Sequence, residues 1–106
     1  MGIFGKLFES LAGAAEPLPD NAVLIDVRSP EEFSAGHIED AISLPLACLT
    51  RDIGSVVIDP ATPIIVYCQS GGRSAVARRA LLDIGYQNVI NGGGIRSLAA
   101  RMNRER

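Results

Sequence analysis

The feature that most constrains the fold of this chain is an uninterrupted apolar run, Ile-Ile-Val-Tyr, at residues 64–67. Such a run is typical of a strand that is covered on both faces, as in the middle of a parallel sheet. Small and polar residues follow at 68–72, and residues 73–84 then return to the apolar spacing of a helix. A buried strand, a loop and a helix in this order indicate a parallel α/β unit.

Strands and helices alternate on both sides of this unit. Further strands are predicted at 22–26, 41–44 and 88–90, and further helices at 30–35, 46–53 and 95–104. Ser29 can cap the helix that begins at Pro30, and Glu32 completes a capping box. We therefore expect an α/β domain with a mainly parallel central sheet and helices on both faces.

Two details of packing are also predicted. Gly92–Gly94 is expected to be a turn that lets the last helix pack close to the loop after the central strand. The helix at 73–84 is expected to direct five apolar residues inward: Ala75, Val76, Ala80, Leu81 and Ile84.

Length and composition limit the class of protein. A chain of 106 residues suits one domain, and 47% hydrophobic with 21% charged residues can form a packed core. No apolar run approaches the roughly 18 residues of a membrane-spanning helix. Two cysteines cannot form a disulfide scaffold. We predict a monomer with a cytoplasmic location.

Residues 1–19 are predicted to be separate from the domain at residues 20–106. Lys6 interrupts the apolar core that a signal peptide needs, and it stands where a myristoylation motif has Ser or Thr. Apolar residues recur there at helical spacing: Ile3, Phe4, Leu7, Phe8 and Leu11. We expect a short amphipathic helix that folds back onto the domain and a linker at Pro17 and Pro19, with a docking or membrane-surface helix as the alternative.

The charge is distributed unevenly along the chain. Residues 1–59 hold ten acidic and three basic residues, whereas residues 60–106 hold two acidic residues and seven arginines. The net charge of −2 argues against a nucleic-acid partner. The basic half suits a small anion, or else it forms the solvated faces of two helices. The same two roles are predicted for Arg96 and Arg101, which either line the mouth of the pocket or lie on a solvated helix surface.

Cys68 stands at the carboxyl end of the central strand, where open α/β sheets hold their sites. The residues after it are predicted to bind substrate: Gln69, Ser70, Gly71, Gly72, Arg73 and Ser74. The glycines can turn N–H groups inward as an anion-binding nest, the helix start adds partial positive charge, and Arg73 adds a full one. Each effect lowers the pKa of the Cys68 thiol, so Cys68 is predicted to be a nucleophile.

Other kinds of site fit the sequence poorly. The loop lacks the lysine of a P-loop, and Gly92–Gly94 lacks the spacing of a dinucleotide-binding motif. Two cysteines without a C-x-x-C pair and a single histidine supply too few soft ligands for a metal.

The chain resembles the single-domain rhodanese family of thiosulfate sulfurtransferases from about Asn21 to Leu98. The motifs that carry the resemblance are Cys68-Gln-Ser-Gly-Gly-Arg-Ser74, Ile25-Asp-Val-Arg28, Glu32-Phe33 and Gly36-His-Ile38. The family's persulfide-forming cysteine maps onto Cys68, and its sulfur-cradling loop maps onto Gln69–Arg73. Three positions depart from the family, which often has Gly, Asn and Trp where this chain has Asp40, Ser43 and Leu98.

The resemblance implies a sulfur transfer in two steps and without a cofactor. The Cys68 thiolate would take the outer sulfur of a small anionic donor such as thiosulfate, release sulfite and become a persulfide. The acceptor would be cyanide in an assay, and a thiol or a sulfur-carrier protein in a cell. The departures put the substrate preference in question more than the reaction.

Two other functions stay open. A cysteine phosphatase or arsenate reductase of related fold also places Cys and Arg around an oxyanion, with a loop one residue longer in the phosphatases we compare. An interaction module of rhodanese fold would use the N-terminal apolar residues for docking.

Three further features are interpreted as structural. Asp26 and Arg28 are expected to pair with Glu32 or with backbone groups. His37 is expected to satisfy carbonyl groups at the end of its helix. Cys48 is expected to be an inert core residue, with a role as resolving partner of Cys68 as the alternative.

Overall fold

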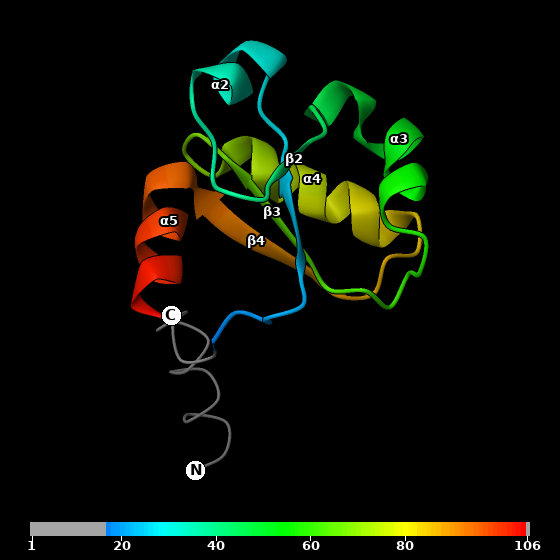
Figure 1. Ribbon diagram of the computed structural model, residues 1–106. Helices are drawn as coiled ribbons and strands as arrows, with labels where there is room; N and C mark the ends of the chain where they lie inside the picture. The colour runs from blue at the N-terminus through cyan, green and yellow to red at the C-terminus, as the bar shows by residue number, and fades with distance from the viewer. Residues whose placement is uncertain (1–16, 106) are drawn as a thin grey trace.

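The computed structural model describes residues 17–105 (Figure 1). The elements follow the chain in this order: β1 (Val23–Asp26), α2 (Pro30–Ala35), β2 (Ile42–Ser43), the 3₁₀ helix η1 (Leu46–Cys48), α3 (Leu49–Val56), β3 (Ile64–Cys68), α4 (Gly72–Asp83), β4 (Val89–Gly94) and α5 (Ile95–Arg104). The helix predicted from the apolar residues at positions 3–11 lies outside the described residues.

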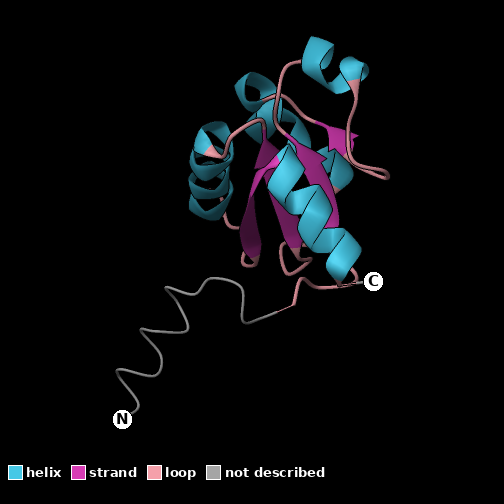
Figure 2. Ribbon diagram, turned by 90° about the vertical axis from the view of Figure 1, so that its left-hand side faces the viewer, coloured by secondary structure: helices cyan, strands magenta, loops and turns pink. Residues whose placement is uncertain are grey.

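Within the described part of the chain, the four strands form one sheet in the order β2-β1-β3-β4. Every strand pair in it is parallel. All five residues of β3 are buried between β1 and β4, which confirms residues 64–67 as part of a central strand. Helices lie on both sides of the sheet (Figure 2), so the predicted α/β class is also confirmed.

The two faces of the sheet are covered by different helices. On one face, Val66 of β3 belongs to a core cluster with Leu49 of α3 and Leu81 of α4. On the other face, Tyr67 clusters with Leu98 of α5. Successive residues of β3 therefore serve opposite faces, as the alternation of side chains along a strand requires.

The structure corrects two predicted packing details. Gly92–Gly94 is the end of β4 and not a turn. A Cβ at Gly92 would lie 2.9 Å from a methyl group of Leu98, so this glycine allows α5 to pack close to β4. The inward face predicted for α4 is confirmed only at Leu81 and is wrong at Val76 and Ile84. Val76 and Ile84 are 57% and 51% exposed, whereas the buried residues of the helix are Ser74, Ala77 and Leu81.

No helix among the described residues is long and apolar enough to cross a bilayer.

Leu18, in the predicted linker, packs against the core cluster beneath α5 and donates its backbone N–H to Glu105 Oε1 at 2.8 Å.

Candidate active site

Cys68 is the last residue of β3, at the edge of the sheet where the carboxyl ends of the parallel strands meet. Its side chain is 1% exposed. The loop at 69–71 connects it directly to α4, which begins at Gly72. The strand, loop and helix thus hold the residues predicted to form the site in one short stretch of chain.

Backbone N–H groups converge on the sulfur of Cys68. The Gly71 N–H donates to Sγ at 2.9 Å, and the Ser74 N–H donates to it at 3.4 Å. Gly71 has a φ of 105°, a left-handed conformation that glycine adopts without strain. The loop therefore forms the nest that the glycines predicted, with the sulfur atom as the group it surrounds.

The surroundings of Cys68 lower the pKa of its thiol below the ordinary value. Burial alone raises this pKa, because it removes water from the charged form. Hydrogen bonds from the Ser74 side chain and from the N–H groups of Ser74, Gly71 and Ser70 outweigh burial. The site consequently favours the thiolate, which is the nucleophilic form of cysteine.

A glycine of β4 lets the loop lie this close to the sheet. A Cβ built at Gly94 would lie 2.8 Å from the carbonyl oxygen of Gln69 and 3.3 Å from Cα of Ser70. Because Gly94 pairs with Cys68 in the sheet, the contact is part of the floor of the site. The glycine run is needed here for close approach rather than for a turn.

Arg73 does not present a free charge to the nest. Its guanidinium donates to both carboxylate oxygens of Glu32, at 2.7 and 2.9 Å. The pair, together with a hydrogen bond from the backbone of Ser29, lowers the pKa of Glu32 to about 2. Arg73 therefore keeps its predicted charge, but this charge is paired, and the pair ties the start of α4 to α2.

Asp26 and Arg28 form a buried ion pair below the loop, with an N–O distance of 2.7 Å. Arg28 also donates to the carbonyl oxygen of Gly36 at 2.7 Å and to Oε1 of Gln69 at 3.0 Å. The predicted structural role with a backbone partner is confirmed. The contact with Gln69 shows in addition that this pair supports the first residue of the loop.

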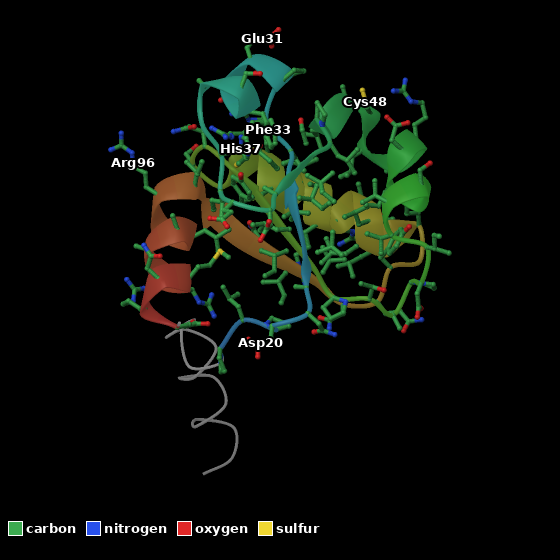
Figure 3. All side chains as sticks on the ribbon, viewed as in Figure 1. Asp20, Glu31, Phe33, His37, Cys48 and Arg96 are labelled. Carbon is green, nitrogen blue, oxygen red and sulfur yellow. The ribbon has the colours of Figure 1, made fainter. Side chains whose placement is uncertain are left out.

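His37 lies beside Phe33 (Figure 3), and the hydrogen bonds of the Cys68 sulfur involve Gly71 and Ser74 rather than His37 or Cys48. The Nδ1 atom of His37 donates to the Phe33 carbonyl at 2.9 Å, and the two rings stack with centroids 3.7 Å apart, which confirms the predicted role of His37 at the helix end. Cys48 is only half-buried, at the end of η1, so the prediction of a core position is wrong.

The arginines of the C-terminal half are largely engaged at other places. Arg79 pairs with Asp83, and Arg101 pairs with Glu105 at 3.0 Å. Arg96 is exposed in the first turn of α5, and its side chain extends away from the domain (Figure 3). These contacts favour the interpretation that the arginines form solvated helix faces, rather than a basic surface that binds an anion at the mouth of the site.

Sequence reasoning missed Asn91 as a neighbour of the site. The Ser74 hydroxyl, beside the Cys68 sulfur, donates to Oδ1 of Asn91 at 2.7 Å. The sequence signal was present but weak: Asn91 is a polar residue at the end of a strand, directly before the glycine run. Among residues 17–105, no group of three His, Cys, Asp or Glu side chains is placed to hold a metal ion.

Comparisons with known proteins agree with this geometry. The family model described as "Rhodanese-like domain" matches residues 10–100. The chain is 37% identical over 75 residues to "Thiosulfate sulfurtransferase PspE" of Escherichia coli strain K12, which covers 71% of this chain and 72% of that protein. It is 32% identical over 93 residues to "Thiosulfate:glutathione sulfurtransferase" of Saccharomyces cerevisiae, covering 77% and 67%.

Solved structures also resemble this fold. The one described as "rhodanese with anions from E. coli" aligns with a TM-score of 0.72 at 36% identity, and the match covers 74% of this chain and 92% of that one. "Human Single Domain Sulfurtranferase TSTD1" aligns with a TM-score of 0.65 at 25% identity, covering 91% of each chain.

Proposed function

The chain belongs to the rhodanese-like domain family, and on this premise we propose that it is a sulfurtransferase that works through a persulfide on Cys68. Relatives named as sulfurtransferases support transfer of sulfur as the general activity. The observation that supports Cys68 as the carrier is its buried sulfur, to which the Gly71 N–H donates at 2.9 Å.

In the first step, the Cys68 thiolate attacks the outer sulfur of thiosulfate. A new S–S bond forms at Cys68, the bond between the two sulfurs of thiosulfate breaks, and its electron pair leaves with sulfite. One negative charge enters on the thiolate and remains on the terminal sulfur of the persulfide. No proton moves, so the step needs no general base once Cys68 is ionised.

The loop stabilises this terminal sulfur anion. The N–H groups of Ser70, Gly71 and Ser74 act on the persulfide as an oxyanion hole acts on a developing oxyanion, with partial positive charge at a fixed distance. The start of α4 adds its own N–H groups at the same place. Arg73 contributes indirectly, by holding the start of α4 against Glu32.

In the second step, the thiolate of an acceptor attacks the terminal sulfur. The S–S bond of the persulfide breaks, Cys68 leaves as a thiolate, and the acceptor keeps the sulfur as a new persulfide. The name of the yeast relative supports a small thiol as this acceptor. Cyanide serves in the same way in an assay and leaves as thiocyanate.

The test is the intact mass of the protein after mixing with thiosulfate. We expect a gain of one sulfur atom, stoichiometric release of sulfite, and loss of the added mass after cyanide treatment. The Cys68→Ser variant should show no gain under the same conditions. A wild-type protein that folds, reacts at Cys68 with an alkylating reagent and yet gains no sulfur would contradict the proposal.

A further inference from the structure

The hydroxyl of Ser74 has more acceptors around it than it has protons. Ser74 is fully buried, and its Oγ lies 2.7 Å from Oδ1 of Asn91, 3.0 Å from the carbonyl oxygen of Gly71 and 3.5 Å from Sγ of Cys68. A serine hydroxyl carries one hydrogen and can donate it to one of these atoms at a time. The direction of that hydrogen is therefore a variable of the site.

The orientation of the Asn91 side chain is fixed by a second donor. The backbone N–H of Gly93 donates to the same Oδ1 atom at 2.9 Å. A backbone N–H requires an acceptor, so the oxygen of Asn91, and not its NH₂ group, must face Ser74. Asn91 can accept the hydroxyl proton but cannot replace it by donating one from the same position.

We propose that Asn91 is a positioning residue that competes with the sulfur of Cys68 for the single hydroxyl proton of Ser74. The inference rests on the proposed role of Cys68 as a thiolate. When Cys68 is a thiol, its S–H donates to Ser74 Oγ and the Ser74 hydroxyl donates to Asn91, so that every hydrogen has an acceptor. This arrangement stabilises the thiol form.

When Cys68 is a thiolate, its sulfur becomes the stronger acceptor for the same proton. The hydroxyl then turns toward Sγ, and Oδ1 of Asn91 keeps the Gly93 N–H as its donor. In the persulfide the charge lies on the outer sulfur, so the inner Sγ no longer attracts the hydroxyl and Asn91 receives it again. Asn91 thus accepts the Ser74 hydroxyl proton while Cys68 carries the persulfide, which is the state between the two steps of sulfur transfer.

Asn91 also suits a substitution experiment. It is exposed, on an edge strand, so that its replacement opens no cavity in the core. The charged groups around the loop are already paired, Arg73 with Glu32 and Arg28 with Asp26. These pairs stay the same in every variant below, and their effect on Cys68 cancels in the comparison.

The test is the pH dependence of Cys68 alkylation by iodoacetamide, measured in a Cys48→Ser background so that one thiol reacts. We expect Asn91→Ala to lower the pKa of Cys68 by about half a unit to one unit. The Ser74 hydroxyl then has the Gly71 carbonyl and the sulfur as acceptors, and the charged thiolate is the stronger of the two. Asn91→Asp, a stronger and charged acceptor, should raise the pKa of Cys68.

A Ser74→Ala background separates this role from simple support of β4. Without the hydroxyl there is no proton to redirect, so Asn91→Ala should no longer shift the pKa of Cys68, and the rise with Asn91→Asp should shrink to the effect of its charge. An unchanged or raised pKa in Asn91→Ala, or the same shift with and without the Ser74 hydroxyl, would overturn the proposal. If Asn91→Ala does not fold, the test is the rise in the pKa of Cys68 that Asn91→Asp causes, compared between proteins with Ser74 and proteins with Ser74→Ala.

Alkylation needs no sulfur donor, so its outcome is independent of sulfur transfer. The predicted shifts in a protein that gains no sulfur from thiosulfate would support the role of Asn91 and contradict the proposed function. A protein that gains sulfur normally but shows none of the pKa shifts would support the proposed function and contradict the role of Asn91.

Discussion

Arg73 and Glu32, which are 41 positions apart in the chain, form a two-point ion pair with N–O distances of 2.7 and 2.9 Å. The same carboxylate accepts the backbone N–H of Ser29 and completes the capping box of α2. Glu32 therefore fixes the start of α2 and, through Arg73, the start of the helix that follows the sulfur nest. The pair links folding of α2 to the shape of the nest.

This ion pair predicts how stability responds to acid. The pKa of Glu32 in the folded protein is about 2, lowered from 4.5, chiefly by Arg73. A group with a lowered pKa stabilises the fold above its unfolded value, and this stabilisation is lost as the pH falls toward the folded value. We expect the urea midpoint of the wild type to decrease as the pH is lowered from 4.5 to about 2. The urea midpoint of the Arg73→Ala variant should decrease less over the same pH range.

Arg79→Ala is the matched control, because Arg79 lies on the same helix but pairs with the exposed Asp83. It should keep the wild-type dependence on pH. Parallel curves for the wild type and Arg73→Ala would mean that the ion pair contributes nothing to acid sensitivity.

A second prediction concerns the buried pair of Asp26 and Arg28, which are 0% and 4% exposed. Removing one partner leaves a buried charge without compensation, at a cost of about 3–5 kcal/mol. We expect Asp26→Ala to lower the free energy of unfolding by this amount in urea titrations. Asp83→Ala, which breaks an exposed pair, should cost about 0.5 kcal/mol or less. Equal losses in the two variants would contradict the prediction.

The two cysteines should differ sharply in turnover. The N–H groups of Gly71 and Ser74 donate to the sulfur of Cys68, whereas Cys48 lies half-buried at the end of η1. We expect Cys48→Ser to keep most of the rate of sulfite release from thiosulfate, and Cys68→Ser to abolish it. If Cys48→Ser loses turnover while it stays folded, Cys48 takes part in the reaction, as a resolving thiol would.

The local features of this fold could be predicted from sequence because each depends on residues close in the chain. The apolar run of β3, the capping box at Ser29 and Glu32, and the glycine loop after Cys68 all follow from spacing and from backbone preferences. The helix starts predicted at 30 and 95 match the observed ones, and the start predicted at 73 is one residue late. The start predicted at 46 falls on η1, three residues before α3.

The misses involve contacts that the spacing of apolar and charged residues does not reveal. The spacing of apolar residues correctly favoured Leu81 as a core residue but wrongly added Val76 and Ile84. Ser74 is held at the cysteine sulfur, and Ala77 lies on the same inward helix face as Ser74 and Leu81. Arg73 has a strong charge in sequence, but its partner 41 positions away decides where that charge acts.

Gly94 gives a fourth prediction, on the floor of the nest. A methyl group at this position would lie 2.8 Å from the carbonyl oxygen of Gln69 and 3.3 Å from Cα of Ser70. Both of these atoms belong to the backbone, so they cannot move away as a flexible side chain could. The loop must then move away from β4, and the N–H groups must move with it. We expect Gly94→Ala to slow sulfite release at least tenfold, whereas Gly54→Ala, where nothing lies within 4 Å, should leave the rate unchanged. Equal rates in the two variants would show that the loop tolerates the shift.

The last prediction is that the length of the loop selects sulfur over phosphate. Four residues separate Cys68 from Arg73, and the nest already brings the Gly71 N–H within 2.9 Å of a single sulfur atom. A phosphoryl group needs a wider ring of donors, because each donor must lie near 2.7–3.1 Å from an oxygen it stabilises. The wild type should therefore transfer sulfur and hydrolyse aryl phosphates only negligibly.

Inserting one glycine after Gly71 tests this directly. Arg73 holds the far end of the loop against Glu32, so the added residue must bulge outward and take N–H groups away from the sulfur. We expect slower sulfite release and, in the wider ring, a gain in binding of phosphate. The same insertion after Ala61, in the exposed turn before β3, should change neither activity. Efficient hydrolysis of an aryl phosphate by the wild type, lost in Cys68→Ser, would instead support a cysteine phosphatase.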